Sequence, residues 1–574
     1  MHLGEIDSLS GSPAAASPPQ LVKTFDAGIV GGDEYGALTG FAQTGDAQPV
    51  FAPANTVPLE RRKKVIIVGG GINGIQQASI LLRDGHVNLQ DIQLFDALNG
   101  YGGVWQKNKY PGCACDVPAM IYTTSYNINK NWTHFYAKRS QIEAYYTEFA
   151  HEYQLEQSTQ FESFVKHCAW DEEHMVWHVG VLNKVTRETE HWLADIVCQC
   201  VGSLDRPKWG NTPGRENFKG VSWHTAYWRN DYDLTGKNVA IIGCGPSAAQ
   251  LIPEIIDKPK HLTVYMRTPP VCVGRGDFAY SWLFRWACRW VPMFAWFIRM
   301  RMNLRMMRFG RRMATDGDPL NDSMTATAVK FMESQISDPV LREKVRPNSK
   351  YYCKRPLRLD NFYTSLARPN CTVLRENLVR YTEHGVVSAD KITGQEVERP
   401  YDVIIFGTGF NVAQFLEHET VTGLNGLDLQ EKWKDHPEAL YGLATSEFPN
   451  MFYCFGPNSA HVWSSQQDNW EQQARFAAKV VRESVLRARK GVKFAMHPNR
   501  VAERRYNDEV QRAQEGKFVW TRPDCVTYYK NDAGWNTYTM PWTWWQFRRM
   551  LARINWSDWE FIEKPLEKVA IDRY

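Results

Sequence analysis

The chain has 574 residues, with 67 basic and 63 acidic side chains and a formal net charge of +4 at pH 7. A hydrophobic content of 43% over this length allows two or three domains with sizeable cores, and the near balance of charge gives no reason to expect a nucleic acid partner. No apolar run of eighteen residues occurs, which argues against a membrane-spanning helix.

Twelve cysteines are spread along the chain without the framework of a small secreted domain, which predicts free thiols in a reducing compartment. They also lack two pairs with the spacing of zinc ligands, so no metal site is expected. The first twenty residues contain acidic side chains and no apolar run, so neither a secretory signal nor a transit peptide is expected. These features favour a cytoplasmic protein.

Residues 1–60 are rich in Gly, Ala, Ser and Pro, which predicts a flexible N-terminal arm or a loose cover over the first domain. From Arg61 an apolar strand runs into the glycine turn 69–74 and then a helix, and LQDIQLFD follows as a second strand. In the turn Gly69-Gly70-Gly71-Ile72-Asn73-Gly74, the first glycine permits a tight turn, Gly71 admits a pyrophosphate and Gly74 allows close helix packing. Asp96 lies 22 residues beyond the turn and is expected to bind ribose hydroxyls.

A second strand, glycine turn and helix begin at Lys237, and the strand after them ends in Arg267 rather than in an acid. An arginine at that place suits the 2′-phosphate of NADPH, whereas an aspartate would repel it. We therefore expect FAD in the first unit and NADPH in the second. The predicted NADPH contacts of this unit are Gly243, Cys244, Gly245, Ser247, Ala248, Arg267 and Thr268.

Two later apolar strands, in 401–411 and 448–460, each end in a glycine turn and are expected to return to the first sheet. The residues of 279–345 have helical spacing and predict an inserted helical region, and a long helix is expected from about Ser465 to Lys490 in the C-terminal part. The fold class is thus α/β, with two Rossmann-like dinucleotide-binding domains. The expected boundaries are 61–206 for the first part of the FAD domain, 207–398 for the NADPH domain, and 399–574 for the return to the FAD domain and the C-terminal segment.

The segment between the two units carries a resemblance. Phe218, Gly220, His224 and Trp228 give the spacing F-x-G-x-x-x-H-x-x-x-W just ahead of the second glycine turn. This resembles the fingerprint of class B flavin monooxygenases of the type I Baeyer-Villiger family, although Arg229 stands where the family usually has Pro or Asp. The resemblance implies that His224 lies at the hinge between the two nucleotide domains and does not transfer protons.

Two further segments resemble the active site of that family. Gly102-Gly103-Val104-Trp105 and 110–116 are similar to the segment at the isoalloxazine edge, and Lys354-Arg355 to the segment that supplies the catalytic arginine. The wording CACDVP is similar to fungal polyketide-pathway members, including the aflatoxin-pathway Baeyer-Villiger enzyme, and places Ala114 where many members have arginine. The resemblance implies catalytic roles for Arg355 and Asp116, FAD contacts from Val104, Trp105, Asp116 and Tyr122, and an NADPH contact from Lys354.

The same resemblance implies a reaction. NADPH would reduce FAD, the reduced flavin would activate dioxygen, and one oxygen atom would enter beside a ketone carbonyl to give an ester or lactone. Arg355 would supply a fixed positive charge and Asp116 would orient it. The many aromatic residues suggest a roomy apolar pocket, and thus an apolar, polycyclic or polyketide-type ketone as substrate. Oxygenation at nitrogen, sulfur or carbon, and a flavin-binding partner protein without turnover, remain alternatives.

Two motifs permit other interpretations. Cys113 and Cys115 could be the redox pair of a flavin disulfide reductase. A disulfide between two cysteines separated by a single residue is strained, however, which favours the interpretation that both are small buried side chains. The segment 280–313 interleaves tryptophans with arginines. It could be core, line a substrate entrance, or contact a membrane surface peripherally.

Overall fold

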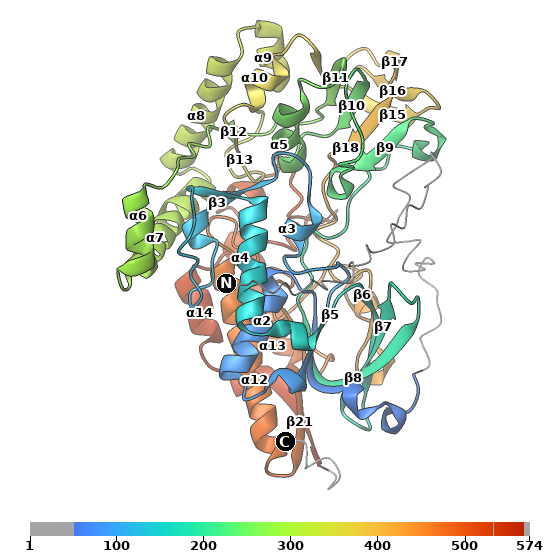
Figure 1. Cartoon of the computed structure of the whole chain (residues 1–574), viewed down its shortest axis with the longest axis vertical. Helices are drawn as coiled ribbons and strands as arrows, with labels where there is room; N and C mark the ends of the chain where they lie inside the picture. The colour runs from blue at the N-terminus through green and yellow to red at the C-terminus, as the bar shows by residue number, and fades with distance from the viewer. Residues whose placement is uncertain (1–50, 532, 567–574) are drawn as a thin grey trace, which may run out of the picture.

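The computed structural model describes residues 51–531 and 533–566, and over these it forms two α/β folds, one above the other in Figure 1. The lower fold contains an eight-stranded sheet with the path β19-β6-β7-β8-β1-β2-β5, and β20 pairs with β8. The upper fold contains a five-stranded sheet with the order β14-β11-β10-β18-β9. The predicted fold class, with two Rossmann-type units, is confirmed.

In the first sheet, β1 pairs in parallel with β2 and β8, and the antiparallel strands β6, β7 and β8 extend it. Residues Val65–Val68 of β1 are fully apolar and all buried, as a strand covered on both faces requires. The strands are β1 (Arg62–Val68), β2 (Ile92–Phe95), β5 (Thr159–Gln160), β6 (Ser163–Asp171), β7 (Val176–Asn183), β8 (Thr189–Gln199), β19 (Thr420–Thr422) and β20 (Met451–Tyr453).

Helices from both ends of the chain complete this fold. Helix α2 (Ile72–Asp84) follows the first glycine turn and packs against α12 (Gln467–Ala488), which confirms the long helix expected in the C-terminal part. The other helices of this fold and of the C-terminal region are α3 (Val104–Lys107), α4 (Arg139–Glu152), α11 (Leu429–Lys432), α13 (Arg500–Gln514) and α14 (Trp544–Leu551). Two antiparallel strand pairs, β3 (Ala114–Pro118) with β4 (Tyr136–Lys138) and β21 (Val492–Pro498) with β22 (Trp559–Pro565), lie beside them.

The second sheet corrects one expectation. The strand within 401–411 joins this sheet and not the first, because β18 pairs with β10 on one side and β9 on the other. Only the strand within 448–460, β20, returns to the first sheet. The five parallel strands are β9 (Val221–His224), β10 (Asn238–Ile242), β11 (His261–Tyr265), β14 (Cys371–Leu374) and β18 (Val403–Phe406).

The inserted helical region stands at the side of the second fold (Figure 1). Its helices are α6 (Trp282–Trp290), α7 (Phe294–Ala314), α8 (Pro319–Gln335) and α9 (Pro339–Val345). The remaining elements of the second fold are α5 (Pro246–Ile255), α10 (Phe362–Leu366), the pair β12 (Cys272–Val273) with β13 (Leu357–Arg358), and the small sheet β15 (Asn377–Tyr381), β16 (Gly385–Ala389) and β17 (Glu396–Pro400). Among the described residues, no helix combines the length and apolarity needed to cross a bilayer.

The residues just before β1 differ from a flexible arm. Phe51 packs against the rings of His178 and His191, and Ala54 and Val57 are buried against β7 and β8. Residues 51–60 therefore cover the first sheet, which is the second of the two expected forms. Positions 1–50 lie outside the described residues.

Candidate active site between the two nucleotide folds

The first glycine turn has the shape that a bound pyrophosphate requires. Gly69 has a φ of +104°, and a Cβ on Gly74 would stand 1.7 Å from the carbonyl oxygen of Gly69, so only glycine fits there. Gly71 is the N-cap of helix α2 and offers no side-chain cap, which leaves the first N–H groups of the helix directed at the turn. Gly103 closes the other wall, because its Cβ would lie 2.8 Å from Cα of Gly71. These residues fit a dinucleotide diphosphate.

The predicted acid of this unit, Asp96, lies beside the first glycine turn. The carboxylate of Asp96 accepts the N–H of Gly70 at 2.5 Å and the N–H of Leu98 at 2.6 Å. Burial raises the pKa of Asp96 to about 6, against the lowering effect of these two backbone donors. Further along, Trp105 Nε1 donates to the hydroxyl of Tyr122 at 3.0 Å, so two of the predicted flavin contacts lie together.

The second glycine turn repeats the geometry. Gly243 has a φ of +98°, and Gly245 is the N-cap of helix α5, again without a side-chain cap. Gly407, at the end of β18, packs so closely that its Cβ would meet that of Ala248 at 2.7 Å. A Cβ on Gly245, by contrast, would meet nothing nearer than 4.0 Å. Folding therefore does not explain a glycine at 245, whereas close approach by a ligand does.

Three cations gather beside this turn. Burial, and then the positive charge of Arg267, lower the pKa of Lys354, which places the two side chains within electrostatic reach. Lys391 Nζ donates to the backbone carbonyl of Arg267 at 3.1 Å. None of the three forms an ion pair with an acidic side chain of the described chain. Like charges held together in this way fit a multiply charged anion such as the 2′-phosphate of NADPH.

Arg355 and Asp116, predicted from segments 239 positions apart, form a bidentate ion pair. Nε of Arg355 donates to one oxygen of Asp116 at 2.8 Å and Nη2 to the other at 2.6 Å. About a third of each side chain stays exposed, 36% and 30%, so one side of the pair faces open space. Burial alone would raise the pKa of Asp116, but Arg355 holds it below its usual value, while the carboxylate raises the pKa of Arg355. Both pKa shifts favour the ionised form of the pair.

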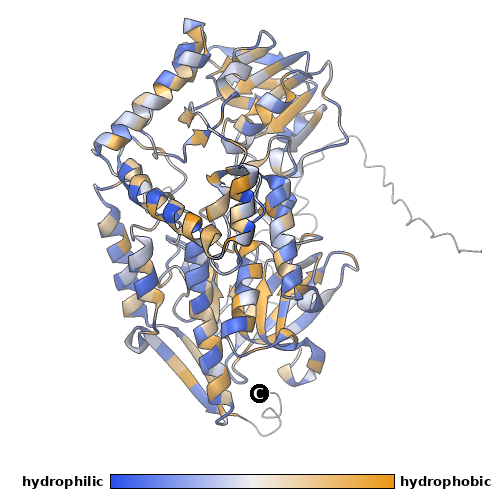
Figure 2. Cartoon of the chain, turned by 60° about the vertical axis from the view of Figure 1, so that its left-hand side comes forward, coloured by the Kyte–Doolittle hydropathy of each residue, from blue (hydrophilic) through white to orange (hydrophobic). Residues whose placement is uncertain are grey.

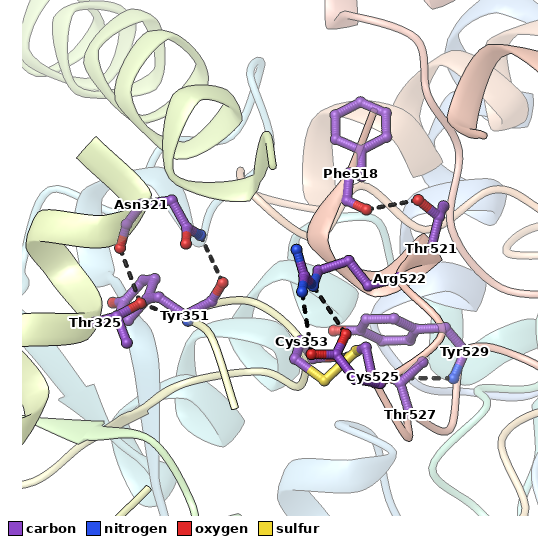
Figure 3. The surroundings of a disulfide bond; sticks show 11 residues. Asn321, Thr325, Tyr351, Cys353, Phe518, Thr521, Arg522, Cys525, Thr527 and Tyr529 are labelled. Atoms are coloured by element: carbon purple, nitrogen blue, oxygen red, sulfur yellow. Dashed lines mark hydrogen bonds and ion pairs between the residues drawn. A yellow bond between two sulfur atoms is a disulfide. The ribbon is translucent and has the colours of Figure 1, made fainter. Parts of the chain in front are cut away.

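A disulfide, which the sequence did not lead us to expect, anchors the loop that carries Arg355. Cys353 is bonded to Cys525 of the C-terminal segment, and both cysteines are buried (Figure 3). The expectation of free thiols throughout is therefore wrong for these two. On the other side of Arg355, the N–H of Leu357 donates to the carbonyl of Val271 at 2.8 Å. Arg355 is thus held between a covalent link and a strand pairing.

Two arginines near the pair were missed by the sequence argument. Arg275 Nη2 donates to the carbonyl of Cys115 at 3.2 Å, and its guanidinium lies 5.3 Å from the ring centroid of Tyr136. Arg358 lies within electrostatic reach of Asp116 and donates to the hydroxyl of Tyr351 at 3.4 Å. Arg358 is three residues from Arg355, and this closeness to the predicted segment is the feature of the sequence that could have identified it.

The other predicted residues are placed as follows. His224 is buried at the end of β9, with ring centroids 5.6 Å from those of Trp209 and Phe410, and burial lowers its pKa to about 4. A neutral, packed histidine suits a positioning role better than proton transfer. Cys113 and Cys115 are free thiols, and burial raises the pKa of both.

The aromatic residues of the C-terminal segment pack against one another more than they line a pocket. Trp520 is stacked on Phe518 at 4.6 Å and on Trp463 at 5.7 Å, and Tyr529 on Tyr538 at 5.6 Å. A pocket does lie at the carboxyl ends of β8 and β20, but neither Arg355 nor Asp116 lines it. These aromatic residues therefore form part of a core, and their number alone does not indicate a large substrate pocket.

Comparisons with known proteins agree with this geometry. Residues 62–426 match the model of the flavin-binding monooxygenase-like family. The chain belongs to this family. It is 30% identical to the FAD-binding monooxygenase BOA2 of Botryotinia fuckeliana, over 90% of this chain and 97% of that protein, and 33% identical to a Baeyer-Villiger monooxygenase of Pseudomonas aeruginosa, over 90% and 94%.

Solved structures share the fold. An oxidized steroid monooxygenase bound to NADP superposes with a TM-score of 0.75 at 22% identity, over 88% of this chain and all of that one. Cyclohexanone monooxygenase from Rhodococcus bound to NADP+ gives 0.74 at 23% identity, over 87% and 99%. With the two glycine turns and the cation cluster, the family assignment makes this member an FAD- and NADPH-dependent flavin monooxygenase.

The open space at Gly245 gives a test of the second nucleotide site. In Gly245→Val we expect the Kd for NADPH to rise about tenfold or more, because the new side chain fills space that the diphosphate needs and not space that the fold needs. Flavin content and melting temperature should stay at the parental values. The Kd for NADPH is measured by titration followed by fluorescence. An unchanged Kd would show that the dinucleotide does not bind at this turn.

The cation cluster gives a second test. Lys354→Ala should raise the KM for NADPH but leave that for NADH nearly unchanged, because only NADPH carries the 2′-phosphate. Lys260→Ala, at an exposed lysine of the same fold, is the matched control. An equal loss with both nucleotides would place Lys354 away from the phosphate.

The disulfide predicts a thiol count. Twelve cysteines with one Cys353–Cys525 bond leave ten thiols that react in denaturant without reductant. Ellman titration should give this value before reduction and twelve after it. The double variant Cys353→Ser/Cys525→Ser should give the same thiol count before and after reduction. Twelve reactive thiols in the unreduced, denatured parental protein would contradict the bond.

Proposed function

We propose that this monooxygenase inserts one atom of dioxygen beside the carbonyl of an apolar ketone and so makes an ester or lactone. The observation that carries the proposal is the bidentate Arg355–Asp116 pair at the junction of the two nucleotide folds. Two relatives that are each 33% identical, from Pseudomonas aeruginosa and Streptomyces coelicolor, are named Baeyer-Villiger monooxygenases, which supports the ketone as the substrate class.

The cofactors divide between the two folds. Gly69, Gly71, Gly74, Asp96, Val104, Trp105, Asp116 and Tyr122 are assigned to FAD, and Gly243, Cys244, Gly245, Ser247, Ala248, Arg267, Thr268 and Lys354 to NADPH. When bound, NADPH supplies a hydride and FAD the electrons that activate dioxygen. His224 is assigned to the hinge between the two folds, because it is buried, neutral and next to the loop that follows β18.

Arg355 contributes fixed positive charge. A guanidinium has five N–H donors, and two of them are used by Asp116, so three remain for a substrate carbonyl or an oxygen atom that gains negative charge. An arginine keeps its proton at every working pH, so it stabilises developing negative charge without serving as an acid. The disulfide at Cys353 and the pairing of β13 fix its position before substrate arrives.

Asp116 sets the direction of that charge. Its two oxygens hold one edge of the guanidinium, which leaves the opposite edge free to face the reacting atoms. It also reduces the penalty of desolvating the arginine when substrate and cofactors cover it. At about a third exposure such a pair adds only about 0–1 kcal/mol to stability, so orientation is the better explanation for it.

Arg355→Ala tests the assignment. We expect ester formation to fall about a hundredfold or more, because oxyanion-type stabilisation is lost, while reduction of the flavin by NADPH continues at nearly the parental rate. Stopped-flow absorbance separates the two steps. Arg368→Ala, at an exposed arginine paired with Asp257 in the same fold, is the control. If Arg355→Ala formed ester at the parental rate, Arg355 would have no role in the reaction.

Products made under labelled dioxygen test the reaction class. With a panel of cyclic and polyketide-type ketones and matched sulfides and amines, mass spectrometry should find one labelled oxygen beside the former carbonyl. Labelled sulfoxide or N-oxide with no ester would favour oxygenation at a heteroatom. A yellow protein that oxidises NADPH with no member of the panel would favour a flavin-binding partner protein.

A further inference from the structure

The helical hairpin α6–α7 exposes an unusual amount of apolar surface. Ten of the 23 large hydrophobic side chains that are exposed in the described chain fall within residues 282–309. The most exposed are Trp282 at 77%, Met293 at 66%, Trp290 at 64%, Leu283 at 57%, Phe297 at 55% and Trp286 at 50%. A soluble monomer seldom gathers such side chains in one place without a partner.

Helix α6 separates an inner and an outer face. Trp282, Trp286 and Trp290 are four residues apart, so their rings form one stripe along the helix. The opposite face carries Cys288, which is buried, and Phe284, which is stacked on Tyr280 at 4.4 Å. Helix α6 therefore packs on the core through the face that carries Phe284 and Cys288, and the tryptophan stripe lies on its outer face. The alternative that the whole segment is core is wrong for these residues.

The outer face is also strongly basic. From Trp282 to Ala314 the chain has eight arginines and no acidic residue, although the whole protein has a net charge of only +4. Five of the eight are exposed and form no ion pair with an acid of the described chain: Arg285, Arg289, Arg301, Arg305 and Arg308. Arg285 and Arg289 are exposed beside the tryptophan stripe, and neither forms an ion pair with an acid of the described chain. In Figure 2, which turns this side forward, apolar and polar positions alternate along the helices of the hairpin.

The hairpin is fixed to the body of the protein. Arg299 is buried and pairs with Asp468 of α12, and it also donates to the carbonyl of Thr123 at 3.0 Å. Asn303 Nδ2 donates to the same carboxylate at 2.9 Å. The loop between the two helices, by contrast, is exposed and apolar at Val291-Pro292-Met293, where a turn in water is usually polar. The buried contacts of Arg299 and Asn303 thus fix the hairpin in place, and its exposed connecting loop is apolar.

We propose that α6 and α7 dock this monooxygenase on an anionic phospholipid surface. Indole rings prefer the headgroup level of a bilayer, guanidinium groups attract its phosphates, and an apolar tip enters the acyl boundary. A nucleic acid would use the arginines but not Leu283, Met293 and Phe297. A lipid interface, by contrast, uses both kinds of side chain.

Vesicle flotation of the FAD-loaded enzyme tests the proposal. The protein should float with vesicles of phosphatidylcholine that contain phosphatidylserine, bind pure phosphatidylcholine at least about tenfold more weakly, and lose binding in high salt. Arg285→Glu/Arg289→Glu and, separately, Trp282→Ala/Trp286→Ala should each weaken binding about tenfold or more. Lys258→Glu/Lys260→Glu, at two exposed lysines of the second fold, changes the charge equally and should bind like the parent.

Flavin absorbance and the rate of NADPH oxidation show that each variant is folded, since none of these residues belongs to the proposed catalytic site. Parental protein that stays with the soluble fraction, or control and hairpin variants that float alike, would overturn the proposal. Sedimentation velocity adds one more outcome. Self-association that is abolished in Trp282→Ala/Trp286→Ala, without flotation of the parent, would assign the face to a second copy of this chain and would also overturn it.

Discussion

The bidentate contact between Arg355 and Asp116 joins the two nucleotide folds at the site of the proposed reaction. One partner lies on β3, which follows the first glycine turn, and the other lies in a loop of the second fold, next to the pairing of β12 and β13. An unpaired guanidinium at such a junction would be poorly oriented, and an unpaired carboxylate there would carry an uncompensated desolvation penalty. The Cys353–Cys525 disulfide and the pairing of β13 hold the chain on either side of Arg355.

The overall charge of the chain hides a marked separation of charge. Arg267, Lys354 and Lys391 gather without acidic partners in the described chain, and the exposed arginines of α6 and α7 form a second basic region on the outer surface. A net charge of +4 reports neither of them. Each cluster attracts anions locally, and acidic residues elsewhere in the chain balance the total charge.

Local patterns gave the sequence argument its successes. Both glycine turns, Asp96 and the long helix α12 depend on residues that are near one another in the chain, and they were predicted. The partner of β18 was not, because VIIF fits the interior of either sheet and apolar periodicity does not name a neighbour. The Cys353–Cys525 bond spans 172 residues, and the spacing of the cysteines carries no sign of it. The outward turn of the tryptophan stripe depends on packing, which composition does not record.

The path of the chain has a consequence for synthesis. The first sheet begins with β1 at residue 62 and receives its last strand, β20, only at 451–453, and α12, which packs on α2, follows still later. The second sheet is complete by residue 406. On the ribosome the inserted fold can close first, while the earlier-made strands wait with an open edge for their C-terminal partners. The early part of the first fold is therefore the region with most need of protection from aggregation as the protein is made.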